Sequence, residues 1–333
     1  MAGRRPALVG HRPARRGRGV RRRHPRPAAA HRLPGGRRRD ARRGGRPVGR
    51  LRDVAGDLAG PGLAGACQDP CVTRLLVAAG QAVPVNGDPA ANVALAADLT
   101  RQAGARGVRL LVLPEAFLTG YDWAAFDRVR ESGQPCEETL EALTEPLRLA
   151  AAEAGCTVLV CTPLLRGEDM RLTTLVVRPG GTVEAAYDKQ HVDRLELPWF
   201  TPGPRGPVVL DVEGVKVAPA ICYDSRFPEH AAAAAAAGAE VYAVSTAYLE
   251  GSTRGRAVSL PARALDNGMF VVAGAALGTC GDRPITGGSC VLDPEGHELA
   301  ALGTEPGLAV AEIDLDLLAE VRARQTMHAD RLG

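Results

Sequence analysis

The stretch AICYDSRFPEH, residues 220–230, contains a cysteine placed where it could do chemistry. Cys222 follows the apolar run KVAPAI and precedes an alanine-rich stretch, so we expect it where a buried strand ends and a helix begins. Pro228 in the first turn, with Asp224 or Ser225 as a cap, would start that helix. A thiol near a helix N-terminus feels the positive end of the helix dipole, which predicts a lowered pKa and a larger thiolate fraction.

An inert, buried side chain is the commoner fate of a cysteine. We expect that fate for three cysteines inside apolar strand patterns: Cys156, Cys161 and Cys290. The position of Cys222 at the end of a strand favours a functional thiol instead.

Three charged residues elsewhere in the chain could assist such a thiol. Glu115 ends the run RLLVLPE, Lys189 ends TVEAAYDK, and Glu196 lies in a polar loop. Each of them alone is typical of a solvated surface charge. A carboxylate at the end of a strand can also accept a thiol proton as a general base.

Short apolar runs alternate with helical stretches from residue 73 onward, and they must position these side chains. We expect strands at 74–82, 107–115, 156–165, 172–178, 182–189, 207–214, 215–223, 240–246, 269–275, 287–293, 297–303 and 308–314. We expect helices at about 89–102, 137–153, 229–237 and 257–267. The mixture predicts one α/β domain in which helices cover the outer faces of a large mixed sheet system.

Four motifs, in their order and spacing, resemble the carbon-nitrogen hydrolase (nitrilase-like) superfamily: LPEAFLTGY, YDKQH, Glu196 before FTPG, and ICYDSRFPE. ARALDNGMFVVA and GGSCVLDPEG also look like segments of that family, so the likeness covers about residues 73–328. It implies a four-layer α-β-β-α sandwich of two mixed β-sheets with helices on the outer faces, and a homodimer or higher homo-oligomer. It also implies that no metal and no organic cofactor is needed.

The resemblance further implies a triad of Glu115, Lys189 and Cys222, with Glu196 as a second glutamate. Glu115 would take the thiol proton as Cys222 attacks an amide carbonyl, and would pass it to the leaving amine. Lys189 and the backbone N–H of Tyr223 would stabilise the oxyanion. Water would then release the acid from a thioester, with Glu196 helping to position the substrate or Lys189.

The residues after the cysteine indicate a branch of this family. Tyr223 and Asp224 stand where true nitrilases have Trp and Glu, which favours amide over nitrile hydrolysis. Arg226 matches a position where carbamoyl-amino-acid hydrolases carry an arginine that can pair with a substrate carboxylate. Ser225 stands where those enzymes carry a second arginine, so an N-carbamoyl compound is the alternative substrate rather than the preferred one. For Arg226 itself, a structural salt bridge is an equal alternative to binding a substrate carboxylate. Two further candidates for substrate binding are Tyr121 and Tyr248.

Two rival functions fit parts of the sequence. A Cys-His hydrolase would use His191 or His230 as its base, although His230 is more typical of a polar residue on a helix face. Residues 1–52 hold 19 arginines and one acidic residue, and such a segment could bind nucleic acid through phosphates. They lack interleaved aromatic residues, and the rest of the chain carries a net charge of −15, so nucleic-acid binding is not expected.

Residues 1–72 contain no serine, threonine or aromatic residue. We interpret them as a disordered Arg/Gly/Pro-rich leader, or as a stretch upstream of the true translation start, with the hydrolase domain at 73–333. No apolar run is long enough to span a membrane. Eight cysteines scattered over 333 residues indicate reduced thiols in a cytoplasmic protein. Cys67 and Cys71, the only close pair, lack partners at zinc spacing.

Overall fold

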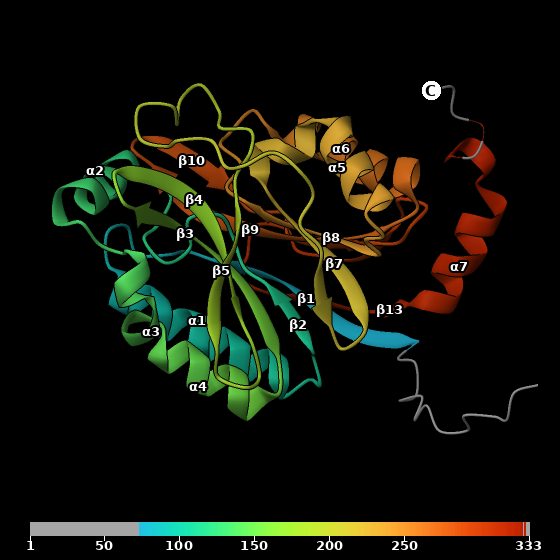
Figure 1. Ribbon diagram of the computed structural model, residues 1–333, viewed down its shortest axis with the longest axis horizontal. Coiled ribbons are helices and arrows are strands. Elements are labelled where there is room, and N and C mark those ends of the chain that lie inside the picture. The colour runs from blue at the N-terminus through green and yellow to red at the C-terminus, as the bar shows by residue number, and fades with distance from the viewer. Residues whose placement is uncertain (1–72, 329, 331–333) are drawn as a thin grey trace, which may run out of the picture. The chain divides into compact units, whose positions relative to one another are not determined.

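A computed structural model describes residues 73–328 and residue 330 of the chain (Figure 1). The expected leader and its cysteine pair lie outside these residues. The strands are β1 (Arg74–Ala82), β2 (Leu110–Val112), β3 (Thr157–Arg166), β4 (Asp169–Val177), β5 (Val183–Asp188), β6 (Leu210–Val212), β7 (Val215–Ile221), β8 (Val241–Thr246), β9 (Phe270–Cys280), β10 (Arg283–Thr286), β11 (Cys290–Leu292), β12 (Glu298–Ala301) and β13 (Gly307–Asp314).

The α-helices are α1 (Pro89–Gly104), α2 (Trp123–Ser132), α3 (Leu140–Leu143), α4 (Glu145–Ala154), α5 (Pro228–Ala236), α6 (Thr253–Asn267) and α7 (Leu315–Arg324). The short 3-10 helices are η1 (Glu137–Thr139), η2 (Cys222–Arg226) and η3 (Thr326–His328). None of the helices in the described part of the chain is long and apolar enough to cross a membrane.

Six parallel strands form the middle of the sheet, in the order β3-β2-β1-β9-β8-β7. The antiparallel strands β4 and β5 extend one end of this order, and β6 extends the other. Because the carboxyl ends of parallel strands meet at one edge, the residues that follow β2, β7 and β8 are brought together there.

The sheet folds into two layers that are joined between β1 and β9. Only two residue pairs link these strands, Gln81 with Ala275 and Ala82 with Ala276. Helices α1, α3 and α4 cover the layer that contains β1 to β5, and α5 and α6 cover the layer that contains β7 to β9 (Figure 1). An apolar core lies under each helix layer, with Leu111 and Leu147 in the first and Tyr242 and Leu260 in the second. A further core lies between the two sheet layers and includes Val77 and Val217. The predicted four-layer sandwich is confirmed, with its two sheet layers continuous with one another.

Close contacts fix the end of β2 against β8 and β9, next to the strand edge where the candidate residues meet. A Cβ atom at Gly274 of β9 would lie 2.4 Å from the carbonyl oxygen of Val112, so only glycine permits this approach. The hydroxyl of Ser245 in β8 donates to the carbonyl oxygen of Leu113 at 2.8 Å. The segment that leads into Glu115 is therefore held from two sides.

Two local predictions are wrong. The helix expected at 137–153 is divided into η1, α3 and α4, because Pro146 lacks the N–H that a continuous helix needs and instead occupies the first turn of α4. Neither Asp224 nor Ser225 caps α5, whose N-cap is Phe227 without a side-chain hydrogen bond. Both are buried in η2, where the Ser225 hydroxyl donates to the carbonyl oxygen of Cys222 at 2.7 Å.

Candidate active site

A buried lysine lies between two buried glutamates at this edge of the sheet. Lys189 follows β5, Glu115 follows β2, and Glu196 lies in the loop after Lys189. The Nζ atom of Lys189 donates to Oε1 of Glu115 at 2.6 Å and to both carboxylate oxygens of Glu196 at 2.8 and 2.7 Å. None of the three side chains is more than 1% exposed, so they are not solvated surface charges.

The charges in this cluster shift one another's pKa. Burial alone would lower the pKa of Lys189, but the two carboxylates raise it well above its usual value, so the ammonium stays charged. Burial raises the pKa of Glu115 to about 8, opposed by Lys189 and reinforced by Glu196. Oε2 of Glu115 is buried and has no hydrogen-bond partner within the described residues. A carboxyl group that titrates near neutral pH and has an oxygen to spare is suited to accept and return a proton.

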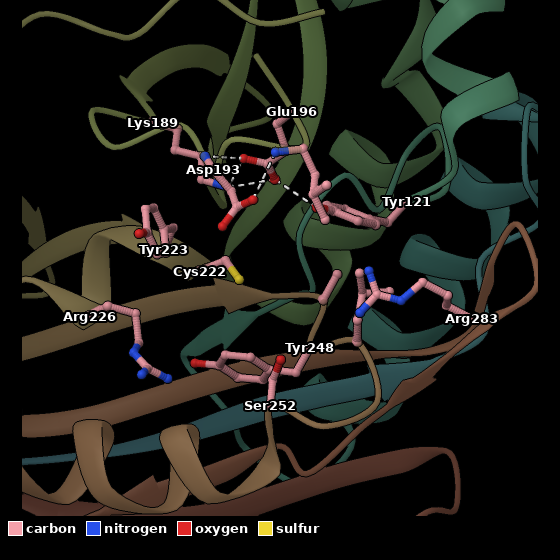
Figure 2. Close-up of a pocket in the computed structure, with 13 residues that line it drawn as sticks. Tyr121, Lys189, Asp193, Glu196, Cys222, Tyr223, Arg226, Tyr248, Ser252 and Arg283 are labelled. Carbon is pink, nitrogen blue, oxygen red and sulfur yellow. Dashed lines mark hydrogen bonds and ion pairs between the residues drawn. The ribbon is translucent and has the colours of Figure 1, made fainter. Parts of the chain in front are cut away.

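Cys222 follows β7 and opens η2 with a backbone φ of 40°, in the left-handed region that non-glycine residues rarely adopt. Its side chain is partly buried and faces a pocket (Figure 2). Burial and the charge of Glu115 raise the pKa of the thiol well above its usual value, against the opposing effect of Lys189. The predicted lowering of this pKa is therefore wrong. The reason is physical: the thiol is buried, Glu115 lies close to it, and the adjacent η2 spans only five residues while α5 starts only at Pro228.

Glu196 is held by two donors besides Lys189. The hydroxyl of Tyr121 donates to Oε1 at 2.7 Å, and the backbone N–H of Asp193 donates to Oε2 at 2.9 Å. Tyr121, a candidate for substrate binding, thus lines the pocket and also fixes Glu196. The carboxylate has a defined position relative to the ammonium.

The pocket in front of Cys222 has a volume of about 290 Å³, which suits a small molecule. Seven of the eight residues that the sequence singled out line it; the eighth, Glu115, does not line it but contacts the side chains of Lys189 and Cys222. Six further lining residues were not among the candidate site residues: Asp193, Leu195, Ala247, Leu249, Ser252 and Arg283 of β10. Nothing in the local sequence marks Arg283, because only the pairing of β10 with β9 brings it here.

Two polar groups on the pocket wall are not used by the protein itself. Arg226 is exposed and forms no ion pair with any described residue, so of its two alternative roles the structural salt bridge is not found. The hydroxyl of Tyr248 is buried, and it has no hydrogen-bond partner in the described part of the chain. Figure 2 shows this hydroxyl directed toward the side of the pocket on which Arg226 lies.

The two histidines considered as bases are engaged elsewhere. His191 interacts through Nδ1 with the carboxylate of Asp224 at 2.9 Å. His230 lies on helix α5, as expected, and is buried there between the hydroxyls of Tyr187 and Tyr242, at 2.8 Å from each. Among the described residues, neither ring hydrogen-bonds to the candidate nucleophile.

The cysteines expected to be structural are buried free thiols, as predicted: Cys156, Cys161 and Cys290. Burial raises the pKa of Cys156 to about 12 and that of Cys290 to about 11. Protonated thiols without access to a pocket are inert packing groups.

Comparisons with known proteins relate this site to others. A family model described as carbon-nitrogen hydrolase matches residues 76–323. The deaminated glutathione amidase of Escherichia coli O157:H7 is 35% identical over 257 residues, which cover 75% of this chain and 94% of that protein. A nitrilase of Pyrococcus abyssi is 34% identical over 238 residues, covering 71% of this chain and 88% of that protein.

Solved structures show the same likeness. The amidase of Nesterenkonia sp. matches with a TM-score of 0.65 and 32% identity, covering 78% of this chain and 96% of that chain. A variant of that amidase carries the acetamide moiety of fluoroacetamide, added covalently at its active-site cysteine. It matches with a TM-score of 0.67 and 32% identity, over 79% of this chain and 98% of that one.

Proposed function

This chain belongs to the carbon-nitrogen hydrolase family, and we propose that Cys222 is the nucleophile with which it cleaves small-molecule amides. The protein is a cysteine-dependent hydrolase of the amidase type. One observation carries the assignment of residues: Lys189, buried between Glu115 and Glu196, lines the same pocket as the thiol.

Acylation begins with a protonated thiol, because the pKa of Cys222 is raised. As Sγ attacks the amide carbonyl carbon, Oε2 of Glu115 accepts the thiol proton. The oxyanion that forms is stabilised by the ammonium of Lys189 and the backbone N–H of Tyr223. Glu115 then gives its proton to the leaving nitrogen, the C–N bond breaks, and a thioester remains on Cys222.

Deacylation repeats these proton transfers with water as the nucleophile. Glu115 accepts a proton from a water molecule as the water oxygen attacks the thioester carbonyl carbon. The C–S bond breaks, the acid leaves, and the sulfur recovers its proton from Glu115. Glu196 keeps Lys189 oriented through both half-reactions, since it accepts two of the three hydrogen bonds of the ammonium. Every proton transfer is thus assigned to side chains of this chain.

Intact-mass spectrometry tests the nucleophile. Incubation with butyramide, glutaric acid monoamide or an N-carbamoyl amino acid, followed by acid quenching, is expected to trap an acyl adduct that peptide mapping assigns to Cys222. Cys222→Ala should abolish turnover, whereas Cys136→Ala, which changes a partly exposed free thiol, should leave turnover intact. An adduct on another cysteine, or turnover by Cys222→Ala, would refute the assignment.

We further propose that the preferred amides carry a carboxylate at the end remote from the amide. The guanidinium of Arg226, which forms no ion pair with any described residue, can bind a carboxylate bidentately, and the hydroxyl of Tyr248 lies on the same pocket wall (Figure 2). N-carbamoyl amino acids also carry a carboxylate and are the first alternative substrates. Nitriles are the second alternative, because one relative of this chain is a nitrilase.

Arg226→Met is expected to raise KM for glutaric acid monoamide by about 10- to 100-fold, since a charge-assisted hydrogen bond contributes about 1.5 to 3 kcal/mol. KM for butyramide, which has no carboxylate, should change less than threefold. Steady-state kinetics on both amides measures the difference. Arg283→Met provides the comparison, because Arg283 is the other arginine of the pocket. A larger effect of Arg283→Met on the acidic amide would move the carboxylate site to that side.

We also propose a homodimer and a reducing, cytoplasmic location. The outer face of α6 exposes Val258 and Leu265, which lie two turns apart and would be covered by a second copy. The described cysteines are free thiols, as a reducing compartment would keep them.

A further inference from the structure

The carboxylate of Asp224 accepts four hydrogen bonds although it is completely buried. Oδ1 accepts from the backbone N–H of His191 at 2.8 Å and from its ring Nδ1 at 2.9 Å. Oδ2 accepts from the hydroxyl of Tyr187 at 2.6 Å and from the backbone N–H of Ile221 at 3.1 Å. We call these four bonds the Asp224 clamp.

The clamp joins two segments that strand pairing leaves far apart. Lys189 follows β5 and Cys222 follows β7, and in the sheet order six strands lie between β5 and β7. No hydrogen-bond ladder therefore connects them directly. Tyr187 and His191 lie two residues before and two residues after Lys189, and Ile221 immediately precedes Cys222. Asp224 thus links both flanks of the lysine to the start of the cysteine turn.

The partners of the clamp are themselves held in place. The ring of His191 stacks on Phe227, with centroids 3.9 Å apart and an interplanar angle of 14°. The hydroxyl of Tyr187 also contacts Nε2 of His230, whose other ring nitrogen contacts Tyr242 in β8. A hydrogen-bonded network of this kind, buried except at His191, is rigid.

The charge and the backbone agree with a positioning role. Burial would raise the pKa of Asp224, but its hydrogen bonds from His191 and Tyr187 hold that pKa below its usual value, so the carboxylate is ionised. The bond to Ile221 closes the turn in which Cys222 adopts its φ of 40°. A residue in that region persists only where the surroundings over-determine it.

We propose that Asp224 is a positioning residue, which sets the distance between the thiol of Cys222 and the ammonium of Lys189. The inference rests on the proposed function, since it takes Cys222 as the nucleophile. Asp224 does not touch the reacting atoms in this scheme. It acts through the turn of η2 on one side and through the residues around Lys189 on the other.

Asp224→Asn keeps the size of the side chain but replaces one accepting oxygen by a donor. A displacement of about 1 Å in an active site can cost about 100-fold in rate. We therefore expect kcat for butyramide and the rate of Cys222 alkylation by 2-chloroacetamide to fall about 100-fold, with KM for butyramide within threefold. Tyr187→Phe removes one of the four bonds and should lower both rates about fivefold.

Asp188→Asn is the matched control for lost stability. Asp188 directly precedes Lys189, is only 6% exposed, and accepts from Thr173, Arg166 and Arg171, but it makes no bond to the cysteine turn. We expect a lower melting temperature for Asp188→Asn, with kcat and alkylation rate within threefold of wild type. Rates in Asp224→Asn that equal those of Asp188→Asn would overturn the positioning role.

The same measurements separate this inference from the proposed function. If 2-chloroacetamide does not modify Cys222 in the wild-type protein, the nucleophile itself is wrong. If Cys222 is modified at the same rate in wild type and in Asp224→Asn, the nucleophile stands and only the clamp is refuted. Should Asp224→Asn not fold, Tyr187→Phe decides, and an unchanged kcat in that variant would refute the clamp.

Discussion

Replacing Glu115 by glutamine is expected to lower kcat about 1000-fold while Cys222 still reacts with an alkylating amide. Glutamine has nearly the same shape, but it cannot accept the thiol proton or return it to the leaving nitrogen. The negative charge of Glu115 also raises the pKa of Cys222. The apparent pKa of Cys222, measured from 2-chloroacetamide alkylation against pH, should therefore be lower in Glu115→Gln than in wild type.

The pH dependence of kcat/KM gives a second readout of Glu115. Only the ionised carboxylate can accept a proton, and its pKa is raised to about 8. In the wild-type protein kcat/KM should rise as the pH increases toward about 8 and then level off, and Glu115→Gln should lose this rise. Glu229→Gln, an exposed residue of α5, serves as the control and should behave as wild type. A Glu115→Gln variant that keeps a tenth of the wild-type kcat would exclude Glu115 as the base.

The sequence predicts the placement of the site because the relevant residues stand at the ends of apolar runs. Glu115 and Cys222 each follow a buried strand, and parallel strands bring such ends to one edge of the sheet. Lys189 follows the hairpin strand β5, whose turn is marked by Pro179 and two glycines. Patterns within single segments place these three residues at strand ends, but only the resemblance to a family implies that they form one site.

Properties that depend on distant neighbours could not be predicted in the same way. The dipole argument for Cys222 considered only the adjacent helix, whereas burial of the thiol and the charge of Glu115, which follows a different strand, raise its pKa. Glu196 stands in a polar loop, and only its hydrogen bonds with Tyr121 and Lys189 explain its burial. By contrast, the break in the helix expected at 137–153 has a local cause, the proline at 146, that the sequence already contains.

Lys189→Met is expected to abolish turnover and also to destabilise the fold. Removing one partner of a buried ion pair leaves an uncompensated charge and costs about 3 to 5 kcal/mol. Here Glu115 and Glu196 would face each other without the ammonium that now hydrogen-bonds to both. Lys189 opposes the rise in the pKa of Glu115 that burial causes, so loss of the cation raises this pKa further and the folded state binds a proton more readily than the unfolded chain. The free energy of unfolding of the variant should therefore be larger at pH 5 than at pH 8.

Chemical denaturation at pH 5 and pH 8 measures the free energy of unfolding of Lys189→Met. Two further variants separate the effect on stability from the effect on catalysis. Lys216→Met changes an exposed residue of β7, the strand that leads to Cys222, and removes its ion pair with Asp211 of β6. This variant should change neither stability nor turnover measurably. Adding Glu115→Gln and Glu196→Gln to Lys189→Met removes the repelling charges, so stability should return while turnover stays absent. If Lys189→Met alone were as stable as wild type at pH 8, the two glutamates would not both be charged. If it also retained turnover, the oxyanion would have to be stabilised by other donors, and the role proposed for Lys189 would be wrong.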